Sequence, residues 1–259
     1  MDLQLNGKVF LITGGSSGLG KALAERLVTE DAGGVALMAR DGERLAATAE
    51  ALRESGGDVL ELAGDVRRAE DLSHFVEAAT ARWGRIDGVA NNAGELAAGA
   101  FADHDDVVWK EDLELKLMGA VRLTRLALPA LRESRGSVVN TLAVSGKAPD
   151  AYTTPTSVSR AAGLALTKAL SREFAPEGIR VNAVLIGVIE SGQLERYAAE
   201  AGITPQAYYE RMVASSGIPL GRVGHPREFG DLVSFLLSPR ASYVTGAAIN
   251  LDGGLCPVT

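Results

Sequence analysis

The residues most clearly suited to chemistry form a glycine-rich turn near the start of the 259-residue chain. Gly14, Gly18 and Gly20 lie within the segment Thr13 to Gly20, after an apolar run and before a predicted helix over Lys21 to Glu30. Glycine lets the backbone turn tightly and approach a pyrophosphate, whose charge the free N–H groups of a helix N-terminus stabilise. The turn therefore predicts a dinucleotide site. An ordinary strand-to-helix turn is the alternative interpretation of the same residues.

The end of the second predicted strand carries information about which dinucleotide is bound. In dinucleotide-binding folds an acidic residue at this point accepts the ribose 2′-hydroxyls, whereas an arginine holds a 2′-phosphate. Ala39 offers no carboxylate and Arg40 offers a guanidinium. The pair favours NADP(H) over NAD(H), the alternative being that Arg40 is only a solvated surface charge.

The elements that must position these residues follow an alternating pattern. Short runs of aliphatic and β-branched residues alternate with longer amphipathic segments, which predicts βαβ units and a parallel sheet. Seven strands are expected, at Lys8 to Thr13, Val35 to Ala39, Val59 to Leu62, Gly88 to Asn91, Ser137 to Thr141, Arg180 to Val184 and Ala248 to Leu251. Helical stripes recur at Leu45, Ala49 and Leu52, and again at Leu72, Phe75, Val76 and Ala79. Pro129 is expected to bend or end the long segment from Val107 to Arg132.

One segment departs from the alternation. Residues 191–217 lie between the sixth and seventh strands and contain Tyr197, Tyr208, Tyr209 and Met212 among many charges. Because the segment follows a strand whose carboxyl end faces the ligand crevice of an open α/β sheet, it is predicted to be an inserted helical lid. A surface helical hairpin is the alternative. No linker or repeat divides the chain, so residues 1–259 are expected to form one domain.

Several motifs, taken in their order along the chain, resemble those of the classical short-chain dehydrogenases/reductases. The matching segments are Thr13 to Gly20, Asp65-Val66, Asn91-Asn92-Ala93-Gly94, Arg160-Ala161-Ala162-Gly163, Gly178 to Ala183, Pro219-Leu220-Gly221-Arg222, Val244-Thr245-Gly246 and Asp252-Gly253-Gly254. The likeness covers nearly the whole chain. It implies a Rossmann-type, doubly wound α/β fold that holds a nicotinamide cofactor.

The resemblance also implies where the parts of that cofactor lie. The glycine turn would hold the pyrophosphate, Asp65 and Val66 would flank the adenine, and Asn91 and Gly94 would adjoin the ribose. Val188 and Ile189 would lie near the nicotinamide, although Ile186 replaces the proline that is usual before Gly187. The cofactor residues expected in full are Gly14, Ser16, Ser17, Gly18, Leu19, Gly20, Arg40, Asp65, Val66, Asn91, Ala93, Gly94, Arg160, Gly187, Val188 and Ile189.

The catalytic positions depart from the family pattern. Relatives that reduce carbonyls carry a serine, a tyrosine, a lysine and a helix asparagine; the register here assigns Ala143, Thr156, Arg160 and Lys116 to those four places. Alanine cannot hydrogen-bond a substrate oxygen, threonine lacks a phenol's acidity, and arginine does not release a proton near neutral pH. Cofactor retention is therefore better supported than ordinary proton transfer.

Other proton donors lie close in sequence to the altered positions. Tyr152 has the right chemistry and is expected in a loop beside the cleft, but it stands four residues before Thr156, and a surface tyrosine near Pro149 and Pro155 is the alternative. Ser145, Ser157 and Lys147 are further candidates.

Composition excludes several classes of protein. With 33 acidic against 26 basic side chains the net charge is −7, which argues against a generic binder of nucleic acid or anionic membrane. No apolar run approaches a membrane span, and the single Cys256 is typical of a reducing compartment, so a cytoplasmic location is expected. His74, His104 and His225 stand apart, so no metal site is predicted.

Three functions remain open at this stage. The first is an NADP-dependent oxidoreductase that acts on a carbonyl or alcohol with a nonstandard proton donor. The second is a cofactor-binding pseudoenzyme or scaffold, and the third is a lyase, dehalogenase or cyclase on the same fold. Tyrosines and Met212 in the predicted lid favour a partly apolar small-molecule substrate. The segments Val107 to Pro129 and Thr156 to Phe174 are expected to form a homodimer or homotetramer interface, by resemblance.

Overall fold

All seven predicted strands form, and they pair in parallel in one sheet of the computed structural model, which describes residues 2–258. The order across the sheet is β3-β2-β1-β4-β5-β6-β7. The strands are β1 (Val9–Thr13), β2 (Gly34–Ala39), β3 (Val59–Ala63), β4 (Gly88–Asn91), β5 (Ser137–Ala143), β6 (Arg180–Ile186) and β7 (Ala248–Leu251). β5 and β6 each run two residues beyond their predicted ends, which carries Ala143 and Ile186 to the carboxyl edge of the sheet.

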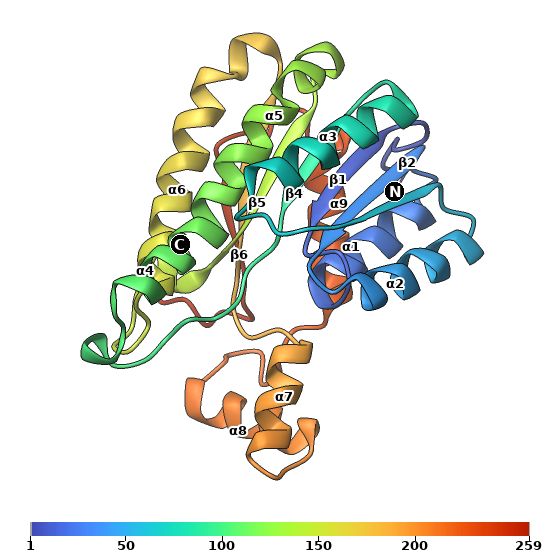
Figure 1. The fold of residues 1–259 in the computed structure, drawn as a ribbon. Coiled ribbons are helices and arrows are strands. Elements are labelled where there is room, and N and C mark those ends of the chain that lie inside the picture. Colours follow the sequence, from blue (N-terminus) through green and yellow to red (C-terminus); the bar gives the residue numbers. More distant parts are fainter. Residues whose placement is uncertain (1, 259) are drawn as a thin grey trace.

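Helices follow the strands and cover both faces of the sheet (Figure 1). They are α1 (Gly18–Thr29), α2 (Gly42–Glu54), α3 (Ala69–Trp83), α4 (Asp106–Leu113), α5 (Gly119–Ser134), α6 (Thr156–Glu173), α7 (Gly192–Glu200), α8 (Pro205–Ser216) and α9 (Pro226–Leu237). Short 3₁₀ turns lie at Phe101–Asp103, Val144–Gly146, Ala175–Glu177 and Pro239–Ala241.

Two apolar cores hold the layers together. On one face, α1, α2 and α9 pack over the strands, with Leu23, Leu45 and Phe229 fully or almost fully buried. On the other face, α3 and α5 bury Phe75 and Leu123, and α6 packs on β5 and β6. The central strand β1 lies between these layers, and every one of its residues is buried, as expected for a parallel sheet covered by helices. The doubly wound Rossmann-type fold is confirmed.

The strand order reverses between β1 and β4, because the chain winds outward to β3 and then returns to the middle of the sheet. Carboxyl ends of parallel strands meet at one edge, and ligands of open α/β sheets bind in the crevice at such a switch point. The glycine turn after β1, Arg40 after β2 and the Asn91-Asn92 pair at the end of β4 therefore converge at this crevice.

Pro129 does not end its helix, so of the two expected effects, a bend or an end, the second is wrong. It lies inside α5, which continues to Ser134. The interruption comes earlier, where a π-helical segment, Glu114–Met118, joins α4 to α5. A π-helical turn inserts one extra residue per turn and re-aims the side chains that it carries, and such turns are frequent at functional sites. Lys116 is in the middle of this segment.

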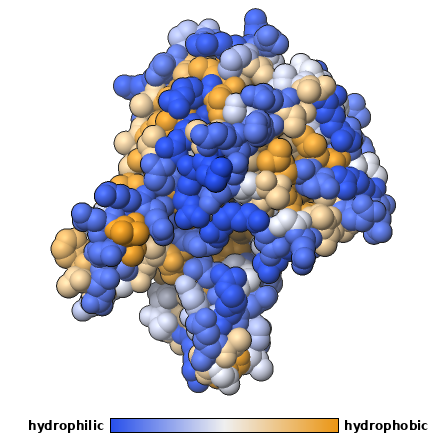
Figure 2. Space-filling view, viewed as in Figure 1, coloured by the Kyte–Doolittle hydropathy of each residue, from blue (hydrophilic) through white to orange (hydrophobic). Residues whose placement is uncertain are grey.

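The segment 191–217 consists of α7 and α8, which project from the carboxyl side of the sheet (Figure 1). Figure 2 shows the projection as a lobe of mixed hydropathy beneath the main body. The side chain of Ser191 caps α7 by accepting from the N–H of Leu194, and Thr204 caps α8 in the same way. Within residues 2–258, no helix has the length and apolar character needed to cross a membrane.

Candidate active site

The glycine turn opens toward a cleft at the carboxyl edge of the sheet. Backbone N–H groups of Gly14 and Gly15 donate to the carbonyl of Met38, at 2.8 and 3.2 Å, and tie the turn to β2. Gly14 and Gly18 have φ values of +69° and +54°, which other residues rarely adopt. A Cβ on Gly14 would lie 3.1 Å from the Cα of Ala93, so no larger residue fits there without displacing the loop after β4.

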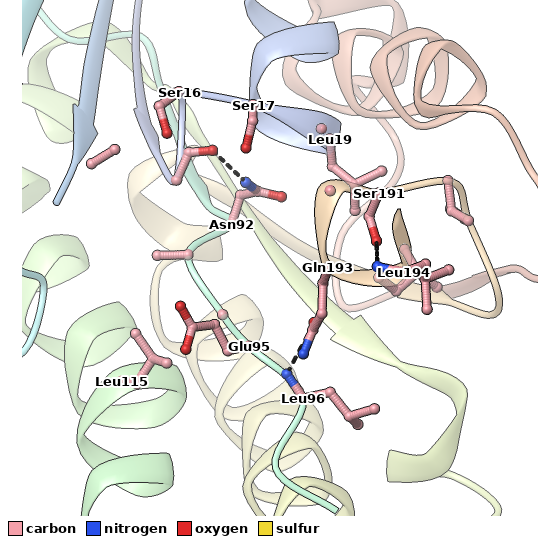
Figure 3. Close-up of a pocket in the computed structure, with 18 of the residues that line it drawn as sticks. Ser16, Ser17, Leu19, Asn92, Glu95, Leu96, Leu115, Ser191, Gln193 and Leu194 are labelled. Atoms are coloured by element: carbon pink, nitrogen blue, oxygen red, sulfur yellow. Dashed lines mark hydrogen bonds between the residues drawn. The ribbon is translucent and has the colours of Figure 1, made fainter. Parts of the chain in front are cut away.

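Asn92 braces the turn from the neighbouring strand. Its Nδ2 donates to the carbonyls of Thr13 and Gly14, at 3.0 and 3.4 Å, and its backbone N–H donates to Oγ1 of Thr13 at 3.0 Å. Figure 3 shows Asn92 against the turn, with Ser16, Ser17 and Leu19 beyond it. Ser17 is the N-cap of α1, yet its hydroxyl makes no capping hydrogen bond. Free N–H groups at this helix N-terminus and an uncommitted hydroxyl suit an anionic ligand.

The cleft has a volume of about 920 Å³, which is in the range of small-molecule and cofactor sites. It is lined by most of the residues expected at a cofactor: Gly14, Ser16, Ser17, Gly18, Leu19, Arg40, Asp65, Val66, Ala93, Gly94, Arg160, Gly187, Val188 and Ile189. Cleft-lining residues that sequence reasoning did not assign include Asp41, Arg44, Gly64, Glu95, Leu96, Leu115, Gln193, Leu194 and Arg196. Only their positions could have indicated them: Asp41, Gly64 and Glu95 lie in the segments that follow β2, β3 and β4. Gln193, Leu194 and Arg196 belong to the segment predicted to be a lid.

Two of the expected cofactor residues lie behind the cleft lining. A Cβ on Gly20 would lie 2.2 Å from the carbonyl oxygen of Gly14, so this glycine is needed for the close packing of α1 against the turn. Asn91 is buried, and its Nδ2 donates to Oδ1 of Asn140 and to Oγ1 of Thr124, at 2.8 and 3.1 Å. Asn91 therefore links β4 to β5 and α5, while its neighbour Asn92 lines the cleft.

Charged pairs surround the end of the cleft nearest β2 and β3. Arg67 makes a bidentate interaction with Asp65, with hydrogen bonds of 2.6 to 3.0 Å, and these hydrogen bonds hold the pKa of the Asp65 carboxyl below its usual value. Arg40 forms an ion pair with Glu95, and Nε of Arg44 lies 3.5 Å from Oδ2 of Asp41. Arg40 and Arg44 both line the cleft, so this end carries two guanidinium groups.

The four residues that the sequence register assigns to the catalytic positions lie at the other end. Ala143, Thr156 and Arg160 line the cleft, and Lys116 lies directly behind Thr156. Nζ of Lys116 donates to Oγ1 of Thr156 at 2.6 Å and forms a buried ion pair with Asp112. Oγ1 of Thr156 in turn donates to the carbonyl of Ala97 at 2.7 Å. The lysine, the hydroxyl and the aspartate thus form one buried network at the wall of the cleft.

Burial changes the proton affinity of Lys116. Its side chain is 1 % exposed, and removal of the ammonium from water, together with the nearby positive charge of Arg160, lowers its pKa from 10.5 to about 8. Asp112 opposes this shift by stabilising the ammonium. A lysine with a pKa in this range is able to act as an acid or base near neutral pH.

Arg160 places a positive charge beside this network, in the wall of the same cleft. Its Nη1 donates to the carbonyl of Thr141 at 2.7 Å, whereas its buried Nε has no partner within residues 2–258. A Cβ on Gly94 would lie 2.7 Å from Nη2, so the arginine depends on glycine at that position. A buried donor without a partner beside an open cleft is the arrangement expected where a ligand oxygen supplies the acceptor.

The alternative donors weighed from sequence do not line the cleft. Tyr152 is 72 % exposed and has a φ of +63° in the loop before α6. Nζ of Lys147 donates to the carbonyl of Ala248 and to Oδ1 of Asn250, at 3.0 and 2.8 Å, which commits it to the edge of β7. Ser157 is buried in α6, and Ser145 belongs to a 3₁₀ turn after β5.

Of the three histidines, His225 has a structural role, and His74 and His104 have none that the structure assigns. His225 is the N-cap of α9 and pairs through Nδ1 with Glu190 at 3.0 Å. His74 lies on α3 and His104 before α4. Among the described residues, no group of three or more His, Cys, Asp or Glu side chains comes close enough together to hold a metal ion.

The α7 and α8 segment contributes the remaining wall of the cleft. Gln193, Leu194 and Met212 line it, and Oε1 of Gln193 accepts from the N–H of Leu96 at 3.4 Å (Figure 3). Nε2 of the same side chain donates to the hydroxyl of Tyr197 at 2.8 Å. The projection is therefore joined across the cleft to the loop that follows β4.

Comparisons with known proteins match this architecture. Residues 14–256 match the family described as Enoyl-(Acyl carrier protein) reductase. The 3-oxoacyl-[acyl-carrier-protein] reductase of Thermotoga maritima is 34% identical over 256 residues, covering 98% of this chain and 99% of the relative. The chain belongs to the short-chain dehydrogenase/reductase family.

Solved structures of the short-chain dehydrogenase/reductase family superpose closely on the chain. A short chain oxidoreductase from Pseudomonas aeruginosa PAO1, described as containing an atypical catalytic center, has a TM-score of 0.93 and 36% identity, with 98% of this chain and 99% of that chain covered. A structure of the same description contains NADPH. L-sorbose reductase from Gluconobacter frateurii, solved with NADPH and L-sorbose, has a TM-score of 0.94, 32% identity and full coverage of both chains. The relatives are reductases and oxidoreductases, which supports NAD(P)-dependent oxidoreductase chemistry in general terms for this chain.

Proposed function

We propose that the chain is an NADPH-dependent reductase of a carbonyl group, and that Lys116 supplies the proton through Thr156. One observation carries the proposal: a buried lysine with a lowered pKa is hydrogen-bonded at 2.6 Å to the hydroxyl that replaces the family's tyrosine. That arrangement puts a titratable group one hydrogen bond behind the wall of the cleft, where this family needs its acid.

The cofactor end of the cleft fits a nicotinamide dinucleotide. The glycine turn and the N-terminus of α1 would hold the pyrophosphate, and Arg40 with Arg44 would hold a 2′-phosphate. The unpartnered Nε and the Nη2 of Arg160 suit the hydroxyls of the second ribose, and Gly187 to Ile189 would lie near the nicotinamide. NADPH in the related structures supports the same choice of cofactor.

The residues on the other side would complete the reduction. Reduced nicotinamide, when bound, supplies a hydride to the carbonyl carbon, so the carbonyl oxygen gains an electron pair. The hydroxyl of Thr156 turns from the carbonyl of Ala97 toward that oxygen and gives up its proton. As it does so, the ammonium of Lys116 donates a proton to Oγ1 and becomes a neutral amine, so Thr156 relays the proton and is not left as an alkoxide. The lowered pKa of Lys116 and its hydrogen bond to Thr156 make this transfer accessible near neutral pH.

The other candidate donors are less suited. Tyr152 is largely exposed, and Lys147 is already held by two acceptors on β7. Ala143 leaves the substrate oxygen without the serine donor, and a lost donor of this kind typically lowers turnover about 10²- to 10³-fold. Arg160 supplies positive charge nearby, which partly compensates by stabilising developing negative charge.

The substrate end favours a partly apolar molecule. Leu96, Leu115, Val188, Leu194 and Met212 line the cleft there. In the proposed enzyme α7 and α8 form the lid over this end, and Gln193 holds it against the loop after β4. The related enzymes named for oxoacyl and sugar substrates are consistent with a carbonyl carried on a small molecule or acyl chain.

A pair of measurements tests this function. Purified protein is titrated with NADPH and NADH by cofactor fluorescence and calorimetry, and oxidation of bound NADPH is then followed in single turnovers with a panel of ketones and oxoacyl thioesters. NADPH binding in the micromolar range, with turnover, is the expected result. Binding without turnover on the whole panel would favour the cofactor-holding pseudoenzyme, and absence of binding would favour another class of chemistry.

A further inference from the structure

An ion pair crosses the cofactor end of the cleft. The guanidinium of Arg40 contacts the carboxylate of Glu95, and the two residues are separated by 55 positions in the chain. Both side chains are about half exposed, at 51% and 53%, so neither is confined by packing. Both also line the cleft.

The topology makes this pair unusual. Arg40 follows β2 and Glu95 lies in the loop after β4, and the sheet order has β1 between those two strands. Adjacent strands lie about 4.8 Å apart, so the pair spans roughly 10 Å above the carboxyl end of β1. The glycine turn leaves the sheet at this point. The ion pair therefore bridges the switch-point crevice above the turn that would hold the pyrophosphate.

Of the carboxylates at this end of the cleft, Glu95 is the one that pairs with Arg40. The carboxylate of Asp65 is occupied by the bidentate Arg67, and Asp41 accepts from the backbone N–H of Arg44 as the cap of α2. Those acids are committed to local structure. Glu95 has Arg40 as its ion-pair partner among the described residues, and its carboxylate can leave without breaking a helix cap or a strand connection.

We propose that Glu95 is the resident anion of the 2′-phosphate subsite, which holds Arg40 until a phosphorylated adenosine displaces it, and that Glu95 thereby limits the preference of the site for NADPH over NADH. The inference rests on the proposed function, because it assumes that Arg40 receives the 2′-phosphate. A phosphate group carries up to two negative charges and binds a guanidinium bidentately, so it can replace a single carboxylate. NADH brings no such group and leaves the pair intact.

The charge balance predicts the direction of a substitution. When the phosphate is bound, the displaced carboxylate of Glu95 remains close to it and repels it. The change Glu95→Gln removes both the competition and the repulsion while it keeps the size of the side chain. Exposed ion pairs contribute little, so the expected gain in NADPH affinity is about two- to fivefold, with NADH affinity changed by less than that.

The experiment measures binding of two fragments as well as the whole cofactors. Adenosine 2′,5′-bisphosphate and adenosine 5′-monophosphate differ only in the 2′-phosphate and do not reach the catalytic end of the cleft. Their dissociation constants are measured calorimetrically for the unmodified chain, Glu95→Gln, Arg40→Gln and the double variant. Glu177→Gln is the matched control, because Glu177 forms an exposed ion pair with Arg132 far from the cleft in sequence and structure.

Glu95→Gln is expected to lower the dissociation constants of the 2′-phosphorylated fragment and of NADPH only. Adding Arg40→Gln should abolish this gain in affinity in the double variant. Glu177→Gln should leave all the dissociation constants unchanged. An unchanged preference in Glu95→Gln, equal tightening of both fragments, or weaker NADPH binding would each overturn the inference and leave the proposed function standing. Failure of the unmodified chain to bind NADPH and the bisphosphate would overturn both together.

Discussion

Nζ of Lys116 and Oγ1 of Thr156 lie 2.6 Å apart, and this hydrogen bond joins the π-helical segment between α4 and α5 to the first residue of α6. The sequence register predicts that the two residues stand where the short-chain dehydrogenase/reductase pattern has its asparagine and its tyrosine. In this chain they are coupled directly, with Asp112 as a third member of the network. A hydroxyl that is not acidic by itself near neutral pH is thus hydrogen-bonded to a lysine whose lowered pKa allows it to resupply a proton.

The first prediction concerns the pH dependence of carbonyl reduction. Lys116 must be protonated to act as the acid, and its pKa is lowered to about 8 by burial and by Arg160. The rate of reduction, measured as kcat/KM with NADPH, is therefore expected to be constant below this pH and to fall about tenfold per pH unit above it. Alcohol oxidation requires the neutral amine, so its rate should rise over the same interval.

A substitution separates this effect from general damage to the site. Lys116→Arg keeps a positive charge beside Asp112, so the buried carboxylate stays paired, but the guanidinium does not release a proton in this pH range. We expect a loss of turnover of about 10²-fold or more and disappearance of the alkaline limb. A pH profile that keeps its limb near 8 in this variant would exclude Lys116 as the acid.

The second prediction concerns the hydroxyl of Thr156. Thr156→Val has nearly the same shape but removes the oxygen that links Lys116 to the cleft, whereas Thr156→Ser retains it. Single-turnover oxidation of bound NADPH should slow about 10²-fold or more in the valine variant and much less in the serine variant, with NADPH affinity preserved in both. Equal rates in the two variants would show that the proton follows another path.

Loss of the hydroxyl also affects stability, which the same variants can report. The backbone N–H of Ala97 donates to Oγ1 of Thr156 at 3.0 Å, and valine would leave that donor without an acceptor and Lys116 with Asp112 alone. A cost of about 1–3 kcal/mol is expected in the free energy of unfolding by urea. The serine variant, which keeps the acceptor, serves as the control.

Much of the fold could be predicted from sequence, because its signals are local. The strands are continuous apolar runs, α2 and α3 show their buried stripes, and the glycine turn lies at the junction of β1 and α1. These features depend on neighbours in the chain. The long helical segment was the exception, since the break occurs at Glu114–Met118, which contains neither proline nor glycine, while Pro129 is accommodated within α5.

The candidate site was only partly predictable, because its decisive contacts join distant segments. Lys116 and Thr156 are 40 residues apart, and the register identified them as departures from the family without indicating that they touch. The Arg40 and Glu95 pair likewise depends on the order of strands in the sheet. Tyr152 had suitable chemistry, but its exposure depends on a loop conformation that no periodic pattern encodes. The oligomeric state stays a prediction.

The third prediction concerns cofactor choice. Arg40 and Arg44 line the same end of the cleft, and each guanidinium would contact the 2′-phosphate. Arg40→Ala is expected to weaken NADPH binding about tenfold or more and NADH binding much less, and Arg44→Ala to act in the same direction with a smaller effect, because charge-assisted hydrogen bonds contribute roughly 1.5–3 kcal/mol. Fluorescence titrations with both cofactors measure this. Equal losses for NADPH and NADH would indicate a general structural effect.

The last prediction concerns restoration of the family's catalytic residues. Ala143, Thr156 and Arg160 line the cleft, so the triple change Ala143→Ser, Thr156→Tyr, Arg160→Lys would return a serine donor and a phenol to the substrate side. Each group typically contributes about 10²-fold or more, so ketone reduction should rise at least tenfold even with imperfect geometry.

The triple change also removes the oxygen that Lys116 contacts, which leaves a buried cation with fewer partners. Adding Lys116→Asn, with Asp112→Asn to avoid an unpaired carboxylate, should therefore increase turnover further. If neither variant gains activity while NADPH binding and the melting temperature are preserved, the substrate lies in a different position from that of the related reductases.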